Sequence, residues 1–126
     1  MLPHISAMED KVNAENFIKN DIPETNPEDQ ALKIKIFKTL KMVSSWFIEQ
    51  FHDGLNIYPV IILYEVLQEE GIECLLNSGA LVANDTKLFH CWIETKVGFV
   101  DIELDILFTY RPDLKTDNIT LIRGEP

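Results

Sequence analysis

The residues with the clearest chemical potential lie in the pattern His90-Cys91-Trp92-Ile93-Glu94, which two acids, Asp101 and Glu103, follow after a short gap. A carboxylate beside an imidazole can orient the ring, and an imidazole held in this way can take a proton from a water molecule. The chemistry that these residue types allow is therefore proton transfer at His90, provided that the fold brings one acid to it.

The alternation of residues predicts that His90 lies on a strand. Residues 88–95 and 99–104 have the composition of two strands, and the short segment 96–98 between them is typical of a hairpin turn. Successive side chains of a strand point to opposite faces, so His90, Trp92 and Glu94 share one face and Phe89, Cys91 and Ile93 share the other.

The register of this hairpin decides whether an acid reaches His90. A turn that pairs Thr95 with Gly98 sets Glu103 opposite His90 and Asp101 diagonally beside it, on the same face. A shift of one residue would move both acids to the other face. The predicted contact between His90 and a carboxylate therefore depends on this register.

Three short motifs, in this order and spacing, resemble those of the transglutaminase-like superfamily of papain-like cysteine peptidases and acyltransferases. They are Gly71-Ile72-Glu73-Cys74, His90-Cys91-Trp92-Ile93-Glu94 and Gly98-Phe99-Val100-Asp101. The resemblance implies that His90 is a general base and Asp101 its orienting acid, with Glu103 as the alternative acid. It also implies a minimal transglutaminase-like core over residues 55–105.

The chain departs from this superfamily at the nucleophile. The superfamily's cysteine would fall close to Asn56 or Ile57, and residues 54–58 contain no Cys, Ser or Thr. The amide of Asn56 is not a competent nucleophile, because its nitrogen lone pair is delocalised. Asn56 suits a helix cap instead, and we expect Asn56, Tyr58 and Trp92 to be binding residues of the cleft that remains.

Neither cysteine replaces the missing nucleophile in an obvious way. Cys91 adjoins His90 in the sequence, but neighbouring strand residues point to opposite faces. Cys74 lies inside a predicted strand and begins no helix whose dipole would lower its pKa. We expect both to be small core residues, without CxxC or metal-ligand spacing, and the sequence predicts neither a cofactor nor a metal site.

The elements that must position these residues are predicted as follows. A short helix is expected within residues 6–20, and a second helix begins at a Thr25 or Asn26 cap and runs to about His52. Residues 57–70 form an apolar central helix that we expect to be packed on several sides.

Strands then follow the central helix. We expect residues 72–76 and 80–83 to be strands separated by a turn at 77–79, another turn at 84–86, and an edge strand at 119–122. The fold class is therefore α+β, with a helical N-terminal part over residues 6–52 packed against a small antiparallel sheet.

Composition fits one globular domain spanning residues 1–126, with 46% hydrophobic and 25% charged residues. Its net charge of −10 disfavours direct binding of nucleic acid and favours either a basic protein partner or simply solubility. Two cysteines are too few for a secreted disulfide framework, so we expect a cytoplasmic protein. The first residues lack a leader pattern, and no apolar run is long enough to span a bilayer.

Three functions are compatible with this sequence. The first is a non-catalytic transglutaminase-like protein that binds a protein partner through its cleft or acidic surface. The second is a hydrolase or acyltransferase that uses Cys91 or Cys74, or activates water through His90 and Asp101. The third is a small acidic inhibitor or immunity-type protein. The missing nucleophile and the charge favour the first.

Overall fold

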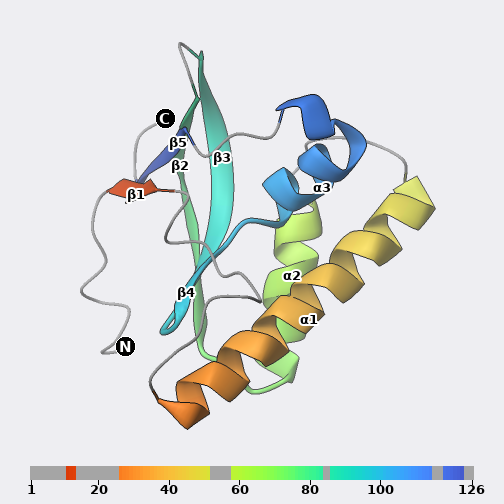
Figure 1. Cartoon of the computed structure of the whole chain (residues 1–126), viewed down its shortest axis with the longest axis vertical. Helices are drawn as coiled ribbons and strands as arrows, with labels where there is room; N and C mark the ends of the chain where they lie inside the picture. The colour runs from red at the N-terminus through yellow and green to blue at the C-terminus, as the bar shows by residue number, and fades with distance from the viewer. Residues whose placement is uncertain (1–10, 14–25, 52–57, 84–85, 115–117, 124–126) are drawn as a thin grey trace.

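The computed structural model describes residues 11–13, 26–51, 58–83, 86–114 and 118–123, and it has the predicted α+β class. Helices and an antiparallel sheet form separate layers (Figure 1). The helices of these ranges are α1 (Pro27–Phe51), α2 (Tyr58–Glu69), α3 (Ile102–Tyr110) and a 3-10 turn at Pro112–Leu114. The strands are β1 (Lys11–Asn13), β2 (Cys74–Ala83), β3 (Thr86–Thr95), β4 (Gly98–Val100) and β5 (Ile119–Arg123), in the sheet order β1-β5-β2-β3-β4.

The start of α1 follows the predicted cap. Asn26 accepts hydrogen bonds at its side-chain oxygen from the backbone N–H groups of Glu28 and Asp29, at 2.8 and 3.3 Å. These bonds satisfy donors that the first turn of a helix leaves without partners. Ile36, Leu40, Val43 and Phe47 recur along α1 at steps of three or four residues, and all four are buried.

Polar side chains of α1 contact Glu70, which directly follows α2, and Asp105 of α3. Lys35 Nζ donates to the carbonyl oxygen of Glu70 at 3.3 Å, and Thr39 Oγ1 donates to Glu70 Oε1 at 2.8 Å. Lys41 Nζ forms an ion pair of 2.6 Å with Asp105 of α3. The side chains of Lys35, Thr39 and Lys41 therefore link α1 to Glu70 and to α3.

The central helix lies where it was predicted, and it packs against α1, α3, β2 and β3. Val60, Leu63 and Leu67 are buried, whereas Tyr58 is 67% and Ile61 is 38% exposed. The remaining side of the helix, which carries Tyr58 and Ile61, faces solvent. Its end is a Schellman motif: Gly71, at φ +77°, donates to Gln68, and Ile72 donates to Leu67.

The turn predicted at residues 77–79 is wrong. β2 continues through it and pairs with β3 from Cys74 opposite Thr95 to Ala83 opposite Thr86. Asn77 lies within this ladder, opposite Trp92, and its side-chain nitrogen donates to Glu94 Oε1 of β3 at 3.3 Å. Gly79 is required for a different reason: a Cβ atom there would overlap the carbonyl oxygen of Ile122 in β5. The turn predicted at 84–86 falls mostly on residues outside the described ranges.

The helix predicted within residues 6–20 is wrong where the structure describes it. Lys11–Asn13 form a strand, β1, that pairs antiparallel with β5. Few apolar residues recur at helical spacing in residues 6–20. Pairing with β5 satisfies the backbone groups of Lys11–Asn13 instead. The rest of that predicted helix lies outside the described residues.

The second hairpin has the predicted register, with Thr95 opposite Gly98 and Ile93 opposite Val100. The predicted strand 99–104 is nevertheless wrong in its second half, because the chain leaves the sheet after Val100 and enters α3. Asp101 is the N-cap of this helix, and its side chain accepts from the backbone N–H of Leu104. A capping aspartate therefore ends the strand.

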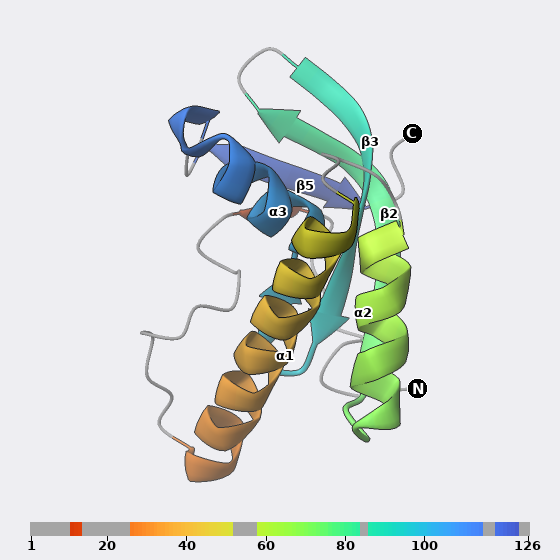
Figure 2. The same cartoon turned by 90° about the vertical axis from the view of Figure 1, so that its right-hand side faces the viewer.

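Buried residues form two clusters on the two sides of the sheet. The helices lie together on one side (Figure 2). The larger cluster joins Cys91 and Ile93 of β3 to the buried residues of α1 and α2. The smaller one surrounds Trp92, with Leu81 and Leu121 from the neighbouring strands. Helix α3 packs against β3 and contributes to both, with Ile106 in the larger cluster and Leu104 in the smaller.

Within the described residues, no helix has the length and apolar character required to cross a membrane.

Candidate functional site

His90 is buried, with 3% of its surface exposed, and both of its ring nitrogens lie next to carboxylates. Nε2 lies 2.6 Å from Asp101 Oδ2, and Nδ1 lies 3.3 Å from Glu103 Oε2. The structure therefore brings together the three residues that the sequence proposed for proton transfer. It does so with both acids at the imidazole, one at each nitrogen.

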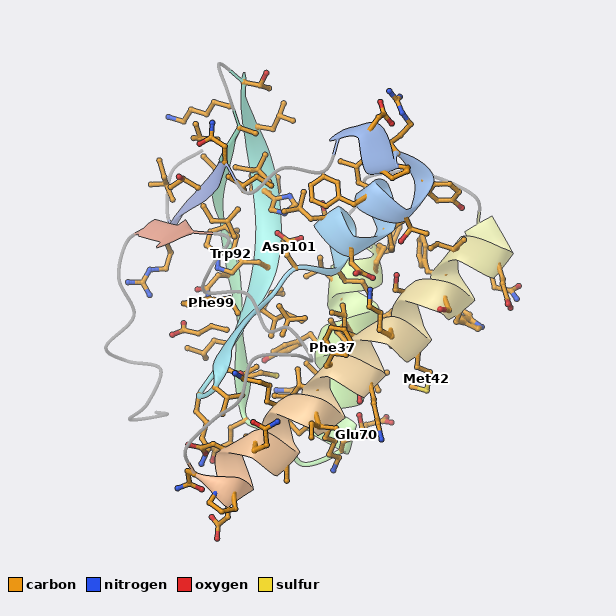
Figure 3. All side chains as sticks on the ribbon, viewed as in Figure 1. Phe37, Met42, Glu70, Trp92, Phe99 and Asp101 are labelled. Carbon is orange, nitrogen blue, oxygen red and sulfur yellow. The ribbon has the colours of Figure 1, made fainter. Side chains whose placement is uncertain are left out.

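The change from strand to helix after Val100 produces this arrangement. Asp101 lies at the junction between β4 and α3 (Figure 3). Its Oδ1 atom accepts from Leu104 N–H at 3.0 Å, which leaves Oδ2 for His90. Glu103 lies in the first turn of α3, so the same helix start delivers the second acid. One carboxylate thus caps a helix and fixes the imidazole at the same time.

The charges around His90 determine its protonation. Burial lowers the pKa of the imidazole, but the negative charge and hydrogen bond of Asp101, together with those of Glu103, outweigh it and raise the pKa to about 10. His90 is therefore an imidazolium at neutral pH. Nε2–H then donates to Asp101 at 2.6 Å, and Nδ1–H faces Glu103 at 3.3 Å.

This cluster is poorly suited to general-base catalysis. A general base needs a ring nitrogen with a free lone pair near neutral pH. Because its pKa is about 10, both ring nitrogens of His90 carry protons at neutral pH, and neither has a free lone pair. Each N–H faces a carboxylate of the protein itself. What the arrangement does provide is a strong link between β3 and the start of α3.

The two cysteines are also unsuited to nucleophilic attack. Both are buried and free of disulfides. Burial raises the pKa of the Cys74 thiol to about 11. Burial also raises the pKa of Cys91, and the negative charges of Glu103 and Asp101 raise it further. Both thiols stay protonated near neutral pH, and the thiolate is the reactive form.

Trp92 lies in the core rather than on a binding surface. Its side chain is fully buried on the side of the sheet opposite α1 and α2, near Phe99 (Figure 3). Its indole nitrogen has no hydrogen-bond partner in the described part of the chain. On the same strand face, Glu94 is buried and bonded to Asn77. Burial raises the pKa of Glu94, although Asn77 and Arg123 oppose this.

Of the two remaining predicted binding residues, the structure describes Tyr58. Tyr58 is the first residue of α2 and is largely exposed. Asn56 and Ile57, where the superfamily's nucleophile would fall, lie outside the described residues. In the ranges that the structure covers, no group of three or more His, Cys, Asp or Glu side chains is arranged to hold a metal ion.

One charged surface did not emerge from the sequence patterns. Glu65 and Glu69 lie one turn apart on the exposed side of α2, and Glu73 is exposed in the connection to β2. We call these three residues the acidic rim. Two of them lie in the C-terminal half of α2, whose helix end is the negative pole of the dipole and disfavours acids. That position is the signal by which the sequence could have identified them.

No family model, curated protein or solved structure matches this chain.

Proposed function

We propose that this chain is a non-catalytic α+β protein with a transglutaminase-like core, and that it binds a basic protein partner through its acidic surface. The observation that carries this proposal is the state of His90. Two carboxylates hold its ring nitrogens at 2.6 and 3.3 Å, so the residue that the resemblance makes a general base serves to hold the fold together.

The enzymatic alternative requires His90 or one of the cysteines to lose a proton near neutral pH. Activation of water by His90 would need the imidazole to lose a proton near neutral pH, although its pKa is about 10. Acyl transfer through Cys74 or Cys91 would need a thiolate that burial disfavours. Binding without catalysis needs neither change.

The surface charge supports a basic partner. The chain has a net charge of −10. Two surface lysines of α1 are paired with acceptors of the same chain, Lys35 with the Glu70 carbonyl and Lys41 with Asp105. The acidic rim is exposed too. Complementary charges of this kind accelerate association and select the partner.

The proposal also includes a transglutaminase-like core and a location in the cytoplasm. A helix followed by strands, and a histidine strand paired in the expected register with the strand before Asp101, support a transglutaminase-like core. Free, buried cysteines suit a reducing cytoplasm, where thiols stay reduced.

The proposal is tested by cross-linking in the native host, identification of the captured protein, and measurement of its direct binding to the purified full chain at several salt concentrations. We expect saturable binding that weakens with salt. Neutralising the acidic rim with Glu65→Gln, Glu69→Gln and Glu73→Gln should weaken binding roughly tenfold or more.

The matched control neutralises three exposed acids elsewhere, with Glu28→Gln, Glu49→Gln and Asp113→Asn. This variant should bind as the natural chain does. Turnover of ester or amide substrates that disappears in His90→Ala, with no saturable protein binding, would contradict the proposal.

A further inference from the structure

Helices α1 and α2 lie side by side and run in opposite directions, with the sheet behind them (Figure 2). Lys35 and Thr39 of α1 both contact Glu70 at the end of α2, so the first half of α1 lies beside the last turns of α2. The second half of α1 then lies beside the start of α2. The sides of these two helices that point away from the core form one surface, which we call the helical face.

One end of the helical face, at the start of α2, is apolar. Met42 is 59% and Trp46 is 46% exposed on α1, and Tyr58 and Ile61 are exposed on the neighbouring part of α2. The side chain of Met42 points away from the sheet (Figure 3). Exposed apolar side chains that gather on one surface are typical of a site of protein association.

The other end of the helical face carries charges of both signs. Lys38 is exposed on α1, and Glu65 and Glu69 of the acidic rim are exposed on the neighbouring part of α2. No ion pair joins Lys38 or Glu69 to another described residue. Both charges can therefore serve a partner that presents the opposite pattern.

A second copy of this chain presents that opposite pattern. A two-fold axis that runs between the two helices, parallel to them, keeps every residue at its height and sets α1 of one copy against α2 of the other. Lys38 then faces Glu69 of the second copy, and the two apolar ends meet. Each contact occurs twice, because a two-fold interface is self-complementary. A basic partner would instead bring its positive charges towards Lys38.

We propose that the helical face joins two copies of this chain in a two-fold dimer, in which α1 of each copy packs antiparallel against α2 of the other. Burial of the apolar end supplies the affinity, and the opposed charges at the other end set the register. The dimer does not depend on the proposed function. It covers Glu65 and Glu69, so a basic partner that binds these two acids competes with dimerisation.

Sedimentation equilibrium of the full chain measures the dimer directly. The experiment is done near physiological salt, which screens the charge of −10 on each copy. We expect a reversible monomer–dimer equilibrium with a dissociation constant of roughly 1–100 μM. A chain that stays monomeric up to about 1 mM would overturn the proposal.

Reversal of single charges tests the arrangement of the two copies. Lys38→Glu sets two acids against each other at both contacts of the dimer, and Glu69→Lys sets two lysines against each other. Each variant alone should dimerise roughly tenfold more weakly, or worse, than the natural chain. An equimolar mixture of the two variants should form a heterodimer with about the natural affinity, because a lysine again faces a glutamate at both contacts. Assembly of the mixture also shows that both variants are folded.

Lys87→Glu is the matched control, because it makes the same change of charge at an exposed lysine of β3. This variant should dimerise as the natural chain does. A dimer that neither charge reversal weakens, or that the mixture fails to restore, would overturn the arrangement. A monomeric chain that still binds its cross-linked partner in a salt-dependent way would overturn the dimer and leave the proposed function standing.

Discussion

His90 Nε2 lies 2.6 Å from Asp101 Oδ2, and the same aspartate caps helix α3 through its other oxygen. The contact joins the middle of β3 to the start of the helix that follows β4. Asp101 therefore has two structural tasks, and both keep the chain turned out of the sheet after Val100. The consequences are measurable in stability, ionisation and reactivity.

Stability should depend on pH through His90. Its pKa is raised from 6.5 to about 10 in the folded protein. The stabilisation is therefore complete below about pH 6.5 and is lost as the pH rises toward 10. We expect the free energy of unfolding to fall between about pH 6.5 and pH 8 with a slope of up to about 1.4 kcal/mol per pH unit. Urea denaturation at several pH values measures this slope.

His90→Gln is the control for this pH dependence. It should be less stable than the natural chain and should lack the contribution of His90 to the slope. The measurement stops at about pH 8, because the cysteines of the unfolded chain, with an ordinary pKa of 9.0, begin to lose protons above that value. Equal slopes in the two proteins would contradict a charged His90.

Substitutions of Asp101 should separate its two tasks. Asp101→Ala removes both the helix cap and the charge partner, and should destabilise the fold by about 3–5 kcal/mol, as when a buried ion pair loses one member. Asp101→Asn can keep the cap to Leu104, so it should cost about 1 kcal/mol less. Chemical denaturation compares the two, and a less stable Asp101→Asn would argue against the capping role.

Both thiols should resist modification in the folded chain. Because burial keeps Cys74 and Cys91 protonated, labelling with a chromogenic disulfide near neutral pH should be roughly a hundredfold or more slower than in urea. Cys74→Ser and Cys91→Ser assign the signals. A thiol that reacts rapidly in the native protein would revive the nucleophilic alternative.

Gly79 should be more sensitive to substitution than Gly71. A methyl group at Gly79 would overlap the Ile122 backbone, so Gly79→Ala must displace β5 and should cost about 3 kcal/mol. Gly71→Ala meets open space and should cost about 1 kcal/mol, for the positive φ alone. Thermal or urea unfolding of the two variants gives the order, and the reverse order would argue against the close approach of β5 to β2.

The sequence predicted the features that depend on local pattern. The cap at Asn26, the span of the central helix and the pairing of Thr95 with Gly98 follow from capping residues, apolar spacing and a short turn. The contact between His90 and Asp101 followed from that register. The sequence therefore predicted that His90 and Asp101 lie close together, but it did not predict that the chain enters α3 after Val100.

Features that depend on distant segments were not predictable in the same way. Asn77 to Gly79 resemble a turn, and only their neighbours, Glu94 and the Ile122 backbone, explain why they form a continuous strand. Strand β1 forms by pairing with β5, which lies more than a hundred residues later in the sequence. The strand expected to continue to Leu104 ends early because Asp101 is a better helix cap than a strand residue.

The protonation of His90 tests the central claim most directly. A long-range nitrogen–proton NMR spectrum of the imidazole, recorded from pH 5 to 11, identifies which ring nitrogens carry protons. We predict that both are protonated at neutral pH and that the ring titrates near pH 10. A neutral ring at pH 7.5 that titrates near its ordinary value of 6.5 would contradict a structural imidazolium and restore His90 as a candidate base.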